Sequence, residues 1–142
     1  MPKINIENIE KSLFSANYKL QISDINYGGH MGNERVLALV QDARIEFLES
    51  LGYSELDIEG VGVIMHNAGV QYISEGFRAN EIRIDLDVKI ESKFKFDFVY
   101  NLYNESSDKL LAKAFTGMAA FNYTTRRVTP IPEAFISKIS VT

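Results

Sequence analysis

The sequence contains no cysteine, only two histidines, and only three prolines, all of which lie near the ends of the chain. Without cysteine, the protein forms no disulfide, has no thiolate nucleophile and builds no cysteine-ligated metal site. Two histidines that lack a His-x-x-x-His spacing do not indicate a zinc site, so we expect no metal. The absence of cysteine also fits a reducing compartment, and we expect a cytoplasmic location.

Long apolar runs and an excess of positive charge are missing as well. No run approaches the ~20 apolar residues of a membrane span, so no membrane partner is expected. The 15 lysine and arginine residues are outnumbered by 19 aspartate and glutamate residues. A nucleic-acid partner, which requires a basic face, is therefore not expected. With 142 residues, 46% of them hydrophobic, the chain has the size and composition of a single globular domain covering residues 1–142.

Hydrophobic periodicity predicts the order of the elements. A period of two predicts strands over residues 18–22, 61–73, 82–90, 94–102 and 110–123. Between the first two strands, apolar residues three and four positions apart predict a helix over residues 33–51. Asn33 is its expected N-cap and Gly52 its expected stop. A short helical turn is expected around residues 133–139.

One long helix and a large antiparallel sheet define an α+β fold in which the helix lies across one sheet face. Only the first connection is expected to be a helical crossover, and the others are expected to be hairpins. The charged face of residues 82–90 should meet water, and Ile82, Ile84, Leu86, Val88 and Ile90 should face the core. The small residues Ala112, Ala114 and Gly117 predict that the last long strand lies centrally beneath the helix.

The most informative segment precedes the long helix and reads Asp24-Ile-Asn-Tyr-Gly-Gly-His-Met-Gly-Asn33. Backbone N–H groups at a helix start stabilise negative charge and suit an oxyanion. Gly28 and Gly29 permit a tight turn with positive φ, and their bare backbone also lets a substrate carbonyl approach. His30 either polarises that carbonyl or orients a water, or it simply joins the loop to the helix.

This segment and layout resemble the hotdog-fold thioesterases, in particular the 4-hydroxybenzoyl-CoA and long-chain acyl-CoA thioesterase branch. The family pattern is roughly Asp-x-Asp-x-x-Gly-His-Val-Asn-Asn, followed by a helix that carries Glu-Glu-Ala-Arg. Here the helix carries Gln41-Asp42-Ala43-Arg44 at the matching distance. Residues 72–81 look like the family's hairpin between its second and third strands. The resemblance covers residues 17–135.

The resemblance implies a hotdog fold: one long central helix packed across a five-stranded antiparallel sheet, with a short C-terminal helical turn. It implies hydrolysis of an acyl-CoA or acyl-carrier-protein thioester by a homodimer or a dimer of dimers, with sites between subunits. Coenzyme A enters as part of the substrate, and no bound cofactor is implied.

The chain departs from the family pattern at Asn26, where the family usually has its catalytic aspartate. An amide is not a general base, although it still orients water or a carbonyl by hydrogen bonds. The carboxylate role therefore falls to Asp24, on the same side of an extended segment, or to Asp42 on the helix. If neither serves, the protein is an acyl-CoA-binding module that does not cleave its ligand.

Each of these residues also has a structural interpretation. Asp24 is either a base or a turn residue ahead of the glycines, and Asp42 is either a base or part of a solvated helix face. Asn33 is interpreted mainly as a helix cap, a role that coexists with substrate binding. His66 lies in an apolar strand, either as a sheet or interface histidine or as a substrate-binding residue.

Overall fold

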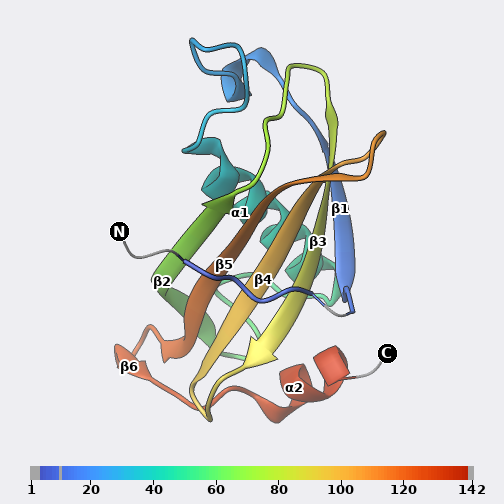
Figure 1. The fold of residues 1–142 in the computed structure, drawn as a ribbon. Helices are drawn as coiled ribbons and strands as arrows, with labels where there is room; N and C mark the ends of the chain where they lie inside the picture. Colours follow the sequence, from blue (N-terminus) through green and yellow to red (C-terminus); the bar gives the residue numbers. More distant parts are fainter. Residues whose placement is uncertain (1–3, 10, 141–142) are drawn as a thin grey trace.

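The computed structural model describes residues 4–9 and 11–140 and contains one sheet with a long helix across it (Figure 1). Along the chain the elements are β1 (Phe14–Lys19), the 3-10 turn η1 (Ile22–Asp24), α1 (Arg35–Ser50), β2 (Gly62–Tyr72), β3 (Glu81–Ile90), β4 (Lys95–Asn104), β5 (Lys109–Asn122), β6 (Arg127–Val128) and α2 (Glu133–Ser140). The predicted α+β content is confirmed, and β6 adds a two-residue strand to the five long ones.

The strands form one antiparallel sheet in the order β1-β3-β4-β5-β2, and β6 pairs with the end of β5. Helix α1 lies behind the sheet in Figure 1 and contacts β1, β3 and β5. β5 is an interior strand as predicted, but β4 occupies the middle of the order. Ala112 and Ala114 of β5 are fully buried, which allows the helix to pack closely on them.

The core forms between α1 and one face of the sheet, because alternate residues of each strand point to the helix. Ile82, Ile84 and Leu86 of β3 are almost completely buried, as are Phe96 and Phe98 of β4. The predicted register of β3 is therefore correct. Ile90 was expected in the core but is 43% exposed, and it is the last residue of β3.

The opposite face of β3 is half-buried rather than exposed, which corrects the prediction for its charged residues. Arg83 lies 3.0–3.2 Å from the carboxylates of Asp85, Glu105 and Asp108, so its charge is paired at the surface. Residues 4–9 cross this face in front of the sheet (Figure 1). Ile6 of that segment is only 8% exposed. Paired charges and a covering segment thus shield a face that the strand pattern predicted to be in water.

The connection from β2 to β3 is a crossover and not the predicted hairpin. β2 lies at one edge of the sheet beside β5, whereas β3 lies between β1 and β4. The connecting segment therefore crosses the end of the sheet, where the Met31 N–H donates to the Gly76 carbonyl (2.7 Å) and the Ala79 N–H donates to the Leu20 carbonyl (3.0 Å). This route brings residues 72–76 beside the glycine-rich loop.

Neither α-helix within the part of the chain that the structure describes has the length and apolar content required to cross a lipid bilayer.

Candidate active site

The glycine-rich loop closes on itself around Asn26. The Asn26 N–H donates to the His30 carbonyl (2.9 Å), and the Asn26 side-chain oxygen accepts the Gly28 N–H (2.8 Å). Gly29 has the predicted positive φ, +86°, whereas Gly28 does not. A Cβ atom on Gly28 would lie 3.2 Å from the Asn26 amide oxygen and 3.4 Å from His30 Nε2. A side chain at Gly28 would thus crowd Asn26 and His30, and Gly29 adopts the positive φ that the turn needs.

Asp24 lies beneath this loop and is 1% exposed. One of its carboxylate oxygens accepts the Gln21 N–H (2.8 Å), and the other accepts Arg35 Nε–H (3.0 Å). The first strand was predicted over residues 18–22, but β1 spans Phe14–Lys19, and Ile22–Asp24 form a 3-10 turn. Asp24 is thus the last residue of the turn, and the extended Ile25 (φ −104°, ψ 133°) follows it. Both Asp24 oxygens accept hydrogen bonds from protein donors.

The helix starts later than predicted, and Asn33 is not its cap. The cap position is Glu34, whose φ of −71° and ψ of −16° are already helical, and no side chain caps the helix. The reason is a preceding turn in which the Arg35 N–H donates to the Gly32 carbonyl (3.0 Å) and which leads directly into α1. Gly52 has φ of +84° and ends the helix as predicted. Among the described residues, the N–H groups of Asn33 and Glu34 have no acceptor.

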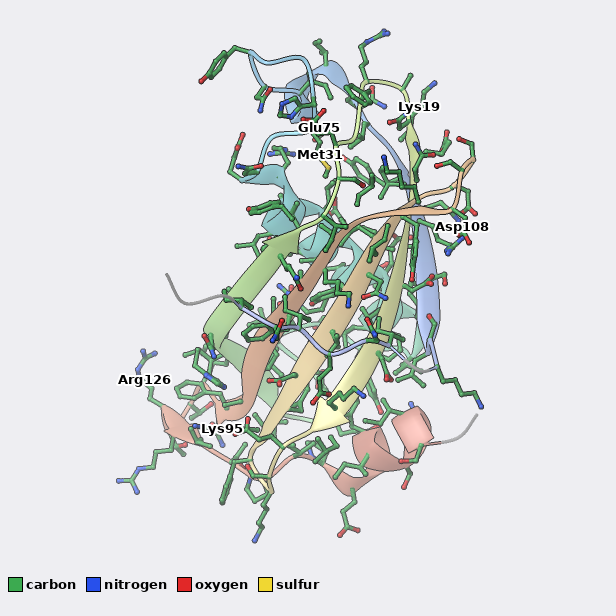
Figure 2. The ribbon with its side chains drawn as sticks, in the orientation of Figure 1. Lys19, Met31, Glu75, Lys95, Asp108 and Arg126 are labelled. Atoms are coloured by element: carbon green, nitrogen blue, oxygen red, sulfur yellow. The ribbon has the colours of Figure 1, made fainter. Side chains whose placement is uncertain are left out.

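A cavity of about 210 Å³ lies at this helix start, lined by residues 30–33 and 72–76. Figure 2 shows Met31 and Glu75 close together at this end of the molecule, away from Lys95 and Arg126. The Tyr72 hydroxyl donates to the Asn33 carbonyl (2.8 Å) and ties the end of β2 to the start of α1. Burial raises the pKa of Tyr72, and the Glu34 carboxylate adds to the rise, so this hydroxyl remains a neutral donor.

Glu75, like Tyr72, lines the cavity although sequence patterns did not predict it as a site residue. Its carboxylate Oε1 lies 3.8 Å from His30 Nε2, and the two side chains are 61% and 33% exposed. Glu75 stands in a short polar break between strands, and nothing in the strand periodicity marks it as a site residue. Only the crossover of the chain places it beside His30.

Two predicted site residues lie elsewhere in the chain. Asp42 is exposed on α1 and does not line the cavity. His66 sits at a bulge in β2, and its ring lies against Gly117, 3.0 Å from the position of a Cβ there. Gly117 pairs with Asp97 on the sheet face opposite α1, so Gly117 does not assist helix packing as predicted. Burial raises the pKa of Asp97, Glu91 raises it further, and His66 opposes this rise.

The structure thus brings His30 and Asn33 together at the cavity and adds Tyr72 and Glu75. Within one chain, Gly28, Gly29, Asp42 and His66 do not line this cavity. Within residues 4–9 and 11–140, no three histidine, aspartate or glutamate side chains converge in an arrangement that would hold a metal ion. The residues that line the cavity include the Asn33 N–H, the His30 imidazole and the Glu75 carboxylate, which are groups of the kinds that add water to a carbonyl and stabilise the resulting oxyanion.

Comparison with known proteins places the chain in a family. The model of the thioesterase-like superfamily matches residues 20–139, whereas no curated protein matches the sequence. A 1,4-dihydroxy-2-naphthoyl-CoA thioesterase from Synechocystis, Slr0204, superimposes with a TM-score of 0.82 at 18% identity, over 90% of this chain and 96% of that one. SAV2348 from Staphylococcus aureus, solved in complex with CoA, gives a TM-score of 0.81 at 20% identity, over 94% and 85% of the two chains.

PA2801 from Pseudomonas aeruginosa gives a TM-score of 0.81 at 16% identity, over 91% of this chain and 99% of that one. At these identities the superpositions establish the fold alone. The predicted hotdog fold is therefore confirmed, with α1 as its long central helix.

Proposed function

Because this chain belongs to the thioesterase-like superfamily, we propose that it hydrolyses an acyl-CoA or acyl-carrier-protein thioester to a free acid and a thiol. One observation carries the proposal: Asn33, whose N–H has no acceptor among the described residues, and His30 both line the cavity at the start of α1. The Synechocystis neighbour is a CoA thioesterase and the S. aureus neighbour binds CoA, which supports a thioester of CoA as the substrate.

In the proposed reaction, water attacks the carbonyl carbon, and a base removes the proton from that water. The electron pair of the carbonyl moves to oxygen, where the free N–H groups and the positive end of α1 stabilise it. Collapse of the tetrahedral intermediate breaks the C–S bond, and the thiolate sulfur takes up the proton. Gly28 packs against the His30 ring, and Asn26 holds the loop around His30 through its hydrogen bonds to the Gly28 N–H and the His30 carbonyl.

The two carboxylates that sequence patterns suggested as bases have different environments. Both oxygens of Asp24 accept hydrogen bonds from protein donors, which supports a structural role for this residue. Asp42 is solvent-exposed on α1 and would reach a thioester only at a site completed by another subunit. Neither lines the cavity that holds His30.

We also propose that the protein works as a homodimer, or as a dimer of two such dimers, joined along β2. This strand is at an edge of the sheet, and its unpaired N–H and C=O groups require a partner or protection. Ile64 and Met65 on this strand are 39% and 50% exposed, so a partner strand would cover apolar surface. His66 and Asn67 lie on the same strand and would approach the partner.

The decisive experiment is a panel of acyl-CoA substrates, from acetyl to palmitoyl with aromatic members included, assayed by release of free thiol. The protein contains no cysteine, so every thiol that is detected comes from the substrate. Turnover of any member supports the proposal and identifies the acyl class. Binding of acyl-CoA in calorimetry without turnover would instead indicate a binding module, the function that the amide of Asn26 favours.

A further inference from the structure

We infer that Glu75 positions His30 as the general base of this site and thereby supplies the carboxylate that Asn26 does not. This inference rests on the proposed thioester hydrolysis and goes further, since it assigns the proton transfer to a pair of residues on two segments. Glu75 acts through the imidazole, so we describe it as a positioning residue.

The backbone around Glu75 is anchored, which gives its carboxylate a defined location. On one side, the Ser74 N–H donates to the Leu111 carbonyl (3.0 Å) and its hydroxyl donates to the Leu110 carbonyl (2.6 Å). On the other side, the Gly76 carbonyl accepts the Met31 N–H (2.7 Å). Glu75 is therefore held next to Met31, the residue that follows His30 (Figure 2), and its Oε1 lies 3.8 Å from His30 Nε2.

His30 is held from its own loop. Its carbonyl accepts the Asn26 N–H at 2.9 Å, and its N–H approaches the Asn26 amide oxygen at 3.5 Å. Its ring presents Nε2 to Glu75, and among the described residues Nδ1 makes no hydrogen bond. A proton on Nε2, fixed by a carboxylate, leaves the lone pair on Nδ1 to accept a proton from water.

The other charges near the cavity do not replace Glu75. Asp24 is paired with Arg35, and the Glu34 carboxylate folds over Gly32, 2.6 Å from the position of a Cβ there. Of the described carboxylates, Glu75 is the one within 4.0 Å of a His30 ring nitrogen. The separation of 3.8 Å is an ion-pair distance, and catalytic contacts of this kind commonly shorten when substrate binds.

The proton balance of the proposed step is complete. His30 Nδ1 takes one proton from the attacking water as the new C–O bond forms, and the Glu75 carboxylate stabilises the imidazolium without being protonated. When the C–S bond breaks, the imidazolium returns that proton to the thiolate sulfur. Both residues end the cycle in the state in which they began it.

The test is a double-mutant cycle of Glu75→Gln and His30→Gln, with Glu133→Gln as the control. Glu133 is an exposed residue at the start of α2, at the opposite end of the molecule. On the best acyl-CoA of the panel, His30→Gln should lower kcat by about 100-fold or more. Glu75→Gln should lower kcat by roughly 10- to 100-fold, with little change in KM. Because the two residues act as a unit, the double variant should lose no more than His30→Gln alone.

Glu75→Asp retains the charge and should recover part of the lost kcat, which a purely structural role would not require. All variants should keep the thermal midpoint of the wild type, since both side chains are partly exposed. Wild-type turnover with an unaffected Glu75→Gln variant would overturn this inference and leave the proposed function intact. Losses that add in full in the double variant would also overturn it. A wild-type protein that hydrolyses no member of the panel would instead overturn the proposed function.

Discussion

The substitution Asp24→Asn tests whether the buried carboxylate anchors the loop or acts as a base. Asp24 accepts two hydrogen bonds, from the Gln21 N–H and from Arg35 Nε–H. Asparagine offers one oxygen and one NH₂ group in the same place, so it retains one acceptor and turns a donor toward the other N–H. Hydrogen bonds to a charged group contribute about 1.5–3 kcal/mol each.

Arg35 is 34% exposed, so its guanidinium can bind water when the ion pair is lost. We therefore expect Asp24→Asn to lower the free energy of unfolding by roughly 2–3 kcal/mol rather than by the full value of both contacts. At about 3 °C for each kcal/mol, a chain of this size should lose roughly 6–9 °C in its thermal midpoint.

Urea denaturation followed by circular dichroism measures this change directly. Asp42→Asn is the matched control, because the same replacement at an exposed helix position should change the free energy of unfolding by less than about 0.5 kcal/mol. If Asp24→Asn kept wild-type stability while kcat fell by about 100-fold or more, the anchoring role would be wrong and Asp24 would be the base.

Three further predictions concern the core and the sheet edge. Arg44 is 4% exposed and donates to the hydroxyl groups of Tyr100 (3.2 Å) and Thr116 (3.4 Å). Arg44→Ala should therefore lower the free energy of unfolding, measured in urea, by about 3 kcal/mol. A loss below about 1 kcal/mol would contradict the role of this buried network. A Cβ on Gly69 would collide with the Phe115 ring, so Gly69→Ala should destabilise the protein by about 1–3 kcal/mol, and an unchanged unfolding midpoint would refute this packing. Sedimentation at micromolar concentration should show a mass above that of the 16.1 kDa chain, and replacing the exposed Met65 of β2 by lysine should shift the protein toward monomer. A folded wild-type monomer would eliminate the proposed β2 interface.

Much of the fold was predictable from the sequence, because side-chain periodicity reports which face of each element is buried. The alternation in β3 identified Ile82, Ile84 and Leu86 as core residues, and apolar residues three and four positions apart predicted the helix that the structure has as α1. The prediction failed where shielding comes from other segments. Residues 4–9 and the partners of Arg83 cover a charged face that alternation alone assigns to water.

The candidate site was only partly predictable, for a related reason. The glycine-rich loop ahead of a helix is a local feature, so its sequence indicated His30, Gly29 and the free N–H groups. The roles of Asp24 and Asn33 depended on backbone geometry, since one lies in a 3-10 turn and the other in a turn before the helix. The predicted strand over residues 18–22 gives way to the 3-10 turn at Ile22–Asp24, and the predicted Asn33 cap is wrong because no side chain caps α1.

The sequence by itself determined which segments are strands and helices and where a polar loop meets a helix start, because these properties depend on neighbouring residues. The order of strands in the sheet depends instead on which edges pair, and a period of two is the same for every order. Only the tertiary structure decided that β2 pairs with β5, so that the chain crosses the end of the sheet to reach β3. That crossover carries Glu75 to within 3.8 Å of His30.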